Sequence, residues 1–109
     1  MRGNELRIKA SHGGITGAQL QALATRLETE FGCVAVGAPI YRTFGTPPNN
    51  GFAAVALYRQ FIITLLSTGT TITVQMLAKG SHDMFALETA IVQGLGLQNA
   101  ALFRQEIDA

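Results

Sequence analysis

The segment from Phe52 to Leu66 constrains the fold most, because its conformation decides how the flanking strands are arranged. It is apolar over most of its length and is interrupted by Arg59 and Gln60. The alanines at positions 53, 54 and 56 favour a helix, and we interpret the segment in that way. The alternative is a strand around Phe61–Leu65 that forms a hairpin with the next segment through Thr68-Gly69.

The N-terminal third of the chain predicts a strand followed by a helix. Residues Glu5 to Ala10 alternate between polar and apolar, which is typical of a half-buried strand. Thr16 and Gln19 have the spacing of a capping box at the start of a helix, and Gly32 is placed to end it. The apolar run Cys33–Ala38 predicts a second strand.

The remainder of the chain predicts a loop, a third strand and two helical segments. The segment from Tyr41 to Gly51, which contains Pro47-Pro48 and Asn49-Asn50, is expected to be a loop. Thr70–Ala78 alternates strictly and places Thr71, Thr73 and Gln75 on a polar second face. Ser81 or Asp83 is expected to cap a helix that ends near Leu95, and the tail from Asn99 to Ile107 is expected to be helical.

Strands that alternate with helices predict a single α/β domain over residues 1–109. The expected architecture is a small two-layer sandwich with a predominantly parallel β-α-β-α-β-α order. The alternative is an α+β domain in which residues 53–65 and 70–78 form an antiparallel hairpin. The polar face of the third strand implies that the second side of the sheet meets solvent or a partner.

A parallel sheet would gather three loops at the carboxyl ends of its strands, where α/β proteins bind ligands. These loops are Ser11–Gly17, Pro39–Gly51 and Lys79–Asp83, and they contain both histidines of the chain. Glycines beside a helix start allow an anion to approach backbone N–H groups. The candidate ligand-binding residues are therefore Ser11, His12, Gly13, Gly14, Arg42, Ser81 and His82. The glycines and Ser81 are equally explained by turn and capping chemistry alone.

Other kinds of chemistry find little support in the sequence. No closely spaced ligand pair predicts a metal site, and acids are too scarce in the chain to favour Ser11 or Ser81 as the nucleophile of a catalytic triad. Cys33 is the only cysteine, so an intrachain disulfide is excluded, and it is expected to be buried. We expect no catalytic residues, no metal and no cofactor.

Composition favours a protein partner over nucleic acid or a membrane. The net charge is +1, and no apolar segment reaches the length of a spanning helix. We therefore expect a soluble, cytoplasmic protein. Charged residues make up only 14% of the chain, against ~25% in an average globular protein. A surface so poor in charge is often covered by a partner or by further copies of the chain.

Two functions remain open from the sequence. The first is a non-enzymatic protein-interaction or self-assembly module, a homo-oligomer or a binder of another protein. A structural subunit, or an adaptor or inhibitor of the phage or bacterial-defence type, would be of this kind. The alternative is a protein that binds a small anion or nucleotide, or handles phosphate, at the rim formed by His12, Arg42 and His82.

Overall fold

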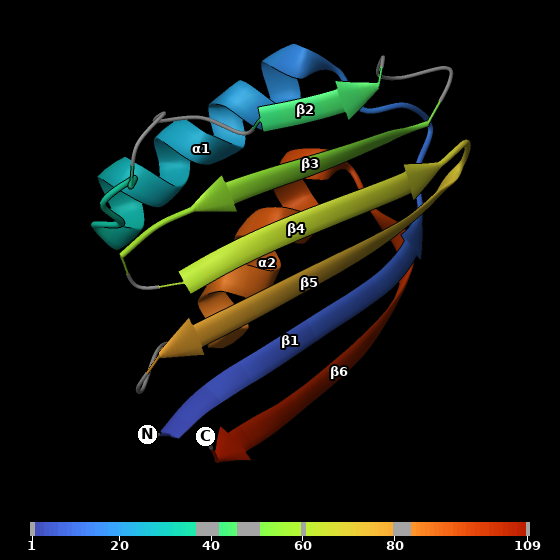
Figure 1. Ribbon diagram of the computed structural model, residues 1–109. Coiled ribbons are helices and arrows are strands. Elements are labelled where there is room, and N and C mark those ends of the chain that lie inside the picture. The colour runs from blue at the N-terminus through green and yellow to red at the C-terminus, as the bar shows by residue number, and fades with distance from the viewer. Residues whose placement is uncertain (1, 37–41, 46–50, 60, 80–83, 109) are drawn as a thin grey trace.

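A computed structural model describes residues 2–36, 42–45, 51–59, 61–79 and 84–108. These residues form an antiparallel sheet and two helices (Figure 1). The elements in chain order are β1 (Arg2–Ser11), α1 (Gly17–Phe31), β2 (Arg42–Gly45), β3 (Phe52–Leu57), β4 (Phe61–Thr68), β5 (Thr71–Lys79), α2 (Met84–Leu95) and β6 (Gln98–Asp108).

The sheet has six strands in the order β2-β3-β4-β5-β1-β6, and every neighbouring pair is antiparallel. The expected parallel β-α-β-α-β-α sandwich is therefore wrong, and the alternative α+β fold with an antiparallel sheet is the one that fits. β2 to β5 follow one another as a meander. β1 then lies between β5 and β6, so the first and last strands of the chain are neighbours (Figure 1).

The predicted helix over residues 52–66 is wrong, because this segment forms β3 and most of β4. Side chains in β3 alternate strictly, with Phe52, Ala54 and Ala56 buried and the residues between them more exposed. That period of two is the strand period, and the alanines fit it because small side chains pack closely under α1 and α2. The hairpin around Gly69, with φ of 75°, matches the alternative interpretation.

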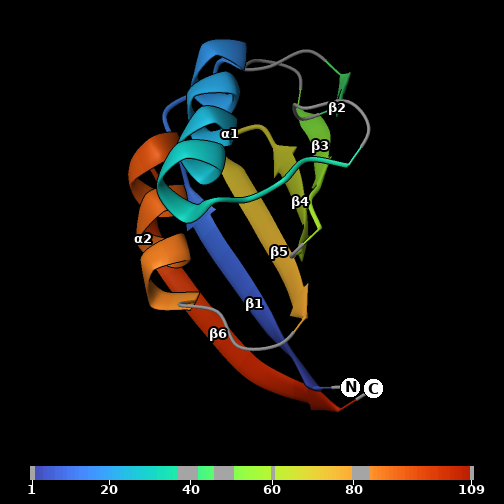
Figure 2. The ribbon, with the colours of Figure 1, turned by 90° about the vertical axis from the view of Figure 1, so that its left-hand side faces the viewer.

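Both helices lie on one face of the sheet, and no other helix or strand among the described residues covers the opposite face (Figure 2). The capping box at Thr16 and Gln19 is confirmed, as is the left-handed Gly32 with φ of 64°. The core lies between the helices and the sheet. It includes the apolar residues of β1 and β5 together with the stripes of the two helices: Leu6, Ile8, Leu20, Leu23, Leu27, Ile72, Val74, Met76, Leu87, Ile91 and Leu95.

Three further expectations need correction. Within the described part of Cys33–Ala38 there is no strand, only a single bridge between Ala35 and Tyr58. The expected loop from Tyr41 to Gly51 contains β2. The tail expected to be helical is the strand β6, because its apolar residues add to the edge of the sheet beside β1.

Within the described ranges, no helix is long and apolar enough to cross a membrane.

Candidate functional site

The side of the sheet that faces away from the helices is the candidate site, and we call it the open face. Directly paired residues of antiparallel strands share a face, so the register assigns its residues. They are Glu5, Arg7, Lys9, Ala53, Val55, Leu57, Ile62, Thr64, Leu66, Thr71, Thr73, Gln75, Leu77, Ala101, Phe103 and Gln105. In Figure 1 the open face is turned toward the viewer and the helices lie behind it.

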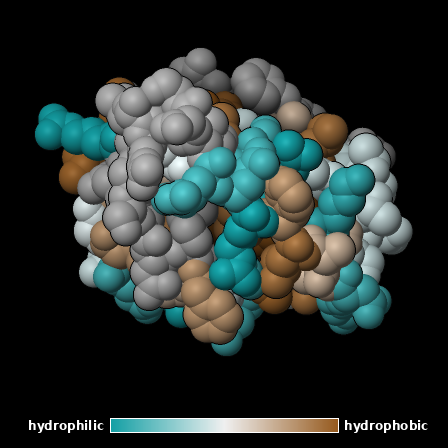
Figure 3. All heavy atoms as spheres, turned by 90° about the horizontal axis from the view of Figure 1, so that it is seen from below, coloured by the Kyte–Doolittle hydropathy of each residue, from teal (hydrophilic) through white to brown (hydrophobic). Residues whose placement is uncertain are grey.

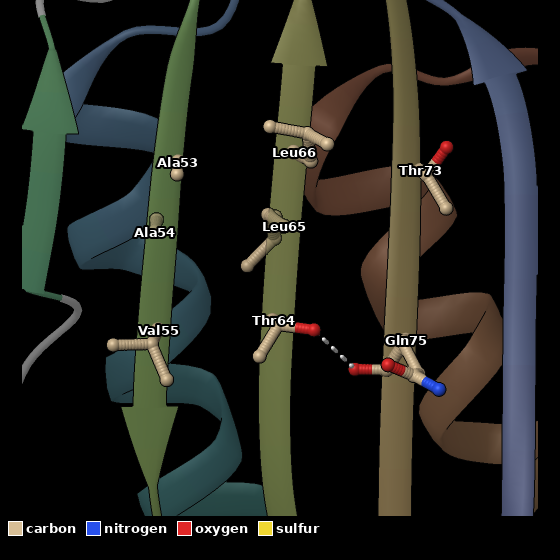
Figure 4. A pocket seen from close by; sticks show the side chains of 8 residues that line it. All are labelled: Ala53, Ala54, Val55, Thr64, Leu65, Leu66, Thr73 and Gln75. Carbon is tan, nitrogen blue, oxygen red and sulfur yellow. Dashed lines mark hydrogen bonds between the residues drawn. The ribbon is translucent and has the colours of Figure 1, made fainter.

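The half of the open face over β3 and β4 is apolar. Leu57, at the end of β3, and Leu66, within β4, are 47% and 55% exposed. Beside Leu66, small side chains leave a shallow hollow of about 310 Å³ that reaches across β4 to Thr73 and Gln75. Figure 4 shows Val55, Thr64 and Gln75 in one row across three strands.

The half of the open face over β1 and β6 carries its charges. Glu5 is 7% exposed, and the Nε of Arg7 lies 2.5 Å from its Oε1. The guanidinium of Arg7 also sits 5.2 Å from the ring centre of Phe103, within the range of a cation–π contact. Glu5, Arg7 and Phe103 therefore form one internally satisfied group.

Lys9 lies two residues farther along β1, and among the described residues no carboxylate pairs with it. It borders a second hollow of about 500 Å³, shared with Ser11, Thr71 and Thr73. Asn99, which also lines this hollow, has a φ of 54° and lies where the β1–β6 register shifts. A single cation in a rim of hydroxyl and amide groups is suited to a small anionic group.

Of the predicted site residues, His12 is buried and fully engaged. Its Nδ1 accepts a hydrogen bond from the backbone N–H of Gly14, so the proton is on Nε2, which donates to the hydroxyl of Ser67 at 2.8 Å. Both His12 and Ser67 are almost fully buried. His12 thus joins the β1–α1 connection to β4, and Gly13 and Gly14 form the turn beside it.

The predicted rim depended on a parallel sheet, and the antiparallel order removes that basis. Arg42 begins β2, which three strands separate from β1, a distance of about 19 Å at normal strand spacing. Ser81 and His82 lie outside the described residues. Lys79, the last described residue before them, pairs with Gly3. Gly3 and Ser11 lie at opposite ends of β1, about 27 Å apart.

A buried group at the other end of α1 contains Cys33 and Tyr58. The burial of Cys33 is confirmed, and burial, with Glu28 nearby, raises the pKa of its thiol. Burial, followed by the charges of Glu28 and Cys33, raises the pKa of Tyr58 to about 12. These shifts oppose a thiolate or phenolate nucleophile at neutral pH. Across the described ranges, no group of three or more His, Cys, Asp or Glu side chains is placed to hold a metal.

The sequence pattern revealed part of the open face. The polar positions of Thr70–Ala78 correctly marked the side of the sheet without helices. Lys9 and Phe103 were missed, although Lys9 occupies the polar phase of the alternating strand Glu5–Ala10. The apolar character of β3 and β4 on this face was hidden because the segment was interpreted as a helix.

Comparisons with known proteins give a fold and no family. No protein-family model matches the chain, and no curated protein matches it. Among solved structures, the chain is similar to the adenosylmethionine decarboxylase of Aquifex aeolicus VF5, with a TM-score of 0.68 and 12% sequence identity. The match covers 94% of this chain and 88% of the other. At this identity the likeness shows a shared fold, a sheet with its helices on one side.

Proposed function

We propose that this protein is a non-enzymatic self-association module that docks a second copy on the open face of its sheet. The observation that carries the proposal is the exposure of large apolar side chains on a face with no covering element. Leu57, Leu66, Leu77 and Phe103 are all between 39% and 55% exposed there. Sheets that meet solvent usually present polar residues on the outer side.

The size of the open face is suited to a stable contact. The strands β3, β4, β5, β1 and β6 have 6, 8, 9, 10 and 11 residues. At about 3.4 Å per residue and about 4.8 Å between strands, the face has a projected area of roughly 700 Å². A standard interface buries about 800 Å² per partner, and the relief of the side chains adds to the projected area. Two sheets packed face to face interdigitate at about 10 Å with strands roughly 30° apart.

The charge pattern of the face favours a second copy as the occupant. Over β3 and β4, and over β5 from Thr71 to Leu77, the described open-face residues carry no charge, so two copies meet there without repulsion. Over β1, Glu5 and Arg7 neutralise each other within one copy. A structural subunit or an adaptor would use the same surface.

The experiment compares two substitutions of exposed apolar residues. Leu66→Asp places a charge in the centre of the open face, and Phe85→Asp places one on α2, where Phe85 is 64% exposed. Light scattering coupled to size exclusion measures the mass of each. We expect a dimer or larger species for the parent chain and for Phe85→Asp, and a smaller mass for Leu66→Asp. A monomeric parent chain at high concentration contradicts the proposal, as does equal disruption by both variants.

A second candidate function is the binding of a small molecule with an anionic group in the hollow beside Lys9. The unpaired cation and the hydroxyls around it favour this candidate, and it retains Ser11 from the predicted site. The structural neighbour is a decarboxylase of adenosylmethionine, a compound that carries a carboxylate. A thermal-shift panel of nucleotides, phosphorylated metabolites and adenosylmethionine tests it. Ligand stabilisation should be lost in Lys9→Gln and kept in Arg26→Gln.

A further inference from the structure

The two edges of the sheet differ greatly in length. β2, at one edge, has four residues, whereas β6, at the other, has eleven. Among the described elements, β6 pairs only with β1, so its outer side lacks a neighbour. Natural sheets protect long edges with charged side chains, especially lysine, with proline or with bulges. β6 contains neither proline nor lysine; its charged residues are Arg104, Glu106 and Asp108, which are of both signs, and its only register shift lies near its start.

The register identifies which backbone groups of β6 point outward. Just beyond the ends of β1 and β5, the N–H of His12 donates to the carbonyl oxygen of Thr70, so His12 and Thr70 are a hydrogen-bonded pair in the register of these two strands. The hydrogen-bonding direction alternates along a strand, so the even-numbered residues of β1 bond to β5 and the odd-numbered residues to β6. Their partners in β6 are the odd-numbered residues from 101 to 107. The N–H and C=O groups of Leu102, Arg104 and Glu106 consequently point away from the sheet.

The side chains along this edge are exposed and chemically mixed. All residues from 101 to 106 are exposed, and Leu102 and Phe103 are 44% and 48% exposed on opposite faces. The view from below, toward the edge at which β6 lies, shows brown hydrophobic and teal hydrophilic residues side by side (Figure 3). An added strand would therefore gain apolar contacts on both faces as well as backbone hydrogen bonds.

Charge selects the register for an added copy of β6. With Gln105 on a two-fold axis, Arg104 lies opposite Glu106 of the second copy, and this favourable pair occurs twice. With Arg104 on the axis, two arginines oppose each other. With Phe103 on the axis, Arg104 faces Leu102. Neither Arg104 nor Glu106 then gains a charged partner in the second copy, and Arg104 keeps the ion pair that it already forms with Glu88 of its own chain, with 3.1 Å between Nε and Oε2.

We propose that β6 pairs antiparallel with β6 of a second copy, with Gln105 on the two-fold axis, and so continues the sheet across two chains. The partner is chosen by self-complementarity, since one strand supplies both members of each charge pair. This edge contact is separate from the open-face contact and does not depend on it. Together, the two contacts would build an assembly larger than a dimer.

Cysteine cross-linking tests the register directly in a Cys33→Ala background. Gln105→Cys places two thiols in a non-hydrogen-bonded pair with Cα atoms about 4.5 Å apart, which suits a disulfide. Ala101→Cys, on the same face of the same strand, leaves the two thiols about 27 Å apart in this register. Under mild oxidation, we expect a disulfide-linked dimer from Gln105→Cys alone. Equal cross-linking of both variants, or of neither, overturns the proposal.

Two further substitutions separate the edge contact from the open-face contact. Leu102→Pro removes an outward N–H and leaves the hydrogen bonds to β1 intact, as proline permits at a sheet edge. Glu106→Arg replaces the charge pair with two repulsive contacts and keeps the backbone groups. Each is expected to abolish the Gln105→Cys cross-link in folded protein, as judged by circular dichroism. The cross-link should persist in Leu66→Asp, so loss of the open-face contact alone leaves this inference standing, while persistence in Glu106→Arg contradicts it.

Discussion

The imidazole of His12 and the hydroxyl of Ser67 form a buried hydrogen bond of 2.8 Å between two parts of the chain that lie 55 residues apart. The pair fixes the first connection of the fold against β4. No ligand is needed to explain a histidine in this loop, because both ring nitrogens already have partners within the protein.

Ser67→Ala is expected to lower the free energy of unfolding by about 1–3 kcal/mol, because it leaves the Nε2–H of His12 buried without an acceptor. Thr68→Ala, at the next and exposed position, is the control and should cost less than about 1 kcal/mol. Urea denaturation measures both. Equal costs would mean that the buried pair contributes nothing specific.

Tyr58→Phe is expected to stabilise the protein by about 1 kcal/mol. The Tyr58 hydroxyl is buried, and among the described residues it has no hydrogen-bond partner, so its removal relieves a desolvation cost. The ring packs against Phe61 with centroids 5.1 Å apart, and phenylalanine keeps that contact. A lower midpoint in urea for Tyr58→Phe would show that the hydroxyl has a favourable interaction.

The raised pKa of Tyr58 also predicts a loss of stability in alkali. Its pKa is about 12 in the folded protein, against an ordinary value of 10.0 for tyrosine. The folded state therefore holds this proton more tightly than the unfolded state between these values, and stability falls as pH rises from about 10 to 12. The expected loss is about 2 kcal/mol. Urea titrations across this range should show a smaller loss for Tyr58→Phe, and identical curves would contradict the assignment.

Gly51→Ala should destabilise the protein more than Gly69→Ala. Both glycines have a positive φ, 73° and 75°, so both substitutions carry the cost of about 1 kcal/mol for a left-handed alanine. A Cβ at Gly51 would also lie 3.0 Å from the carbonyl oxygen of Ser67, whereas a Cβ at Gly69 meets open space. Thermal unfolding of the two variants compares them, and a larger effect at Gly69 would count against the close approach.

Local signals predicted the elements that local chemistry determines. The capping box at Thr16 and Gln19, the end of α1 at Gly32 and the alternation of β5 depend on neighbouring residues only. The strand β3 depends on contacts with β2 and β4. Its alanines have helical propensity, but Ala54 and Ala56 pack in the core, and tertiary packing overrides propensity.

The prediction of the candidate site rested on the same assumption as the predicted fold. The rim of His12, Arg42 and His82 assumed that loops following each strand meet at one end, which is true only for parallel strands. In the antiparallel sheet, successive loops alternate between the two ends. The open face, by contrast, can be predicted once it is known which residues of each strand point away from the core. For β5, the alternation of polar and apolar residues in the sequence identifies them.

The place of β1 in the sheet has a consequence for how the chain reaches its native state. β1 is synthesised before the other strands of the sheet, but Ser11 pairs with Thr71, sixty residues later, and Arg2 pairs with Asp108. The meander from β3 to β5 closes through short turns and has no such delay. Long loops must close before β1 gains its neighbours, and topologies of this kind fold slowly. The apolar residues Leu6 and Ile8 therefore gain their neighbours in the sheet only after β5 and β6 have been synthesised.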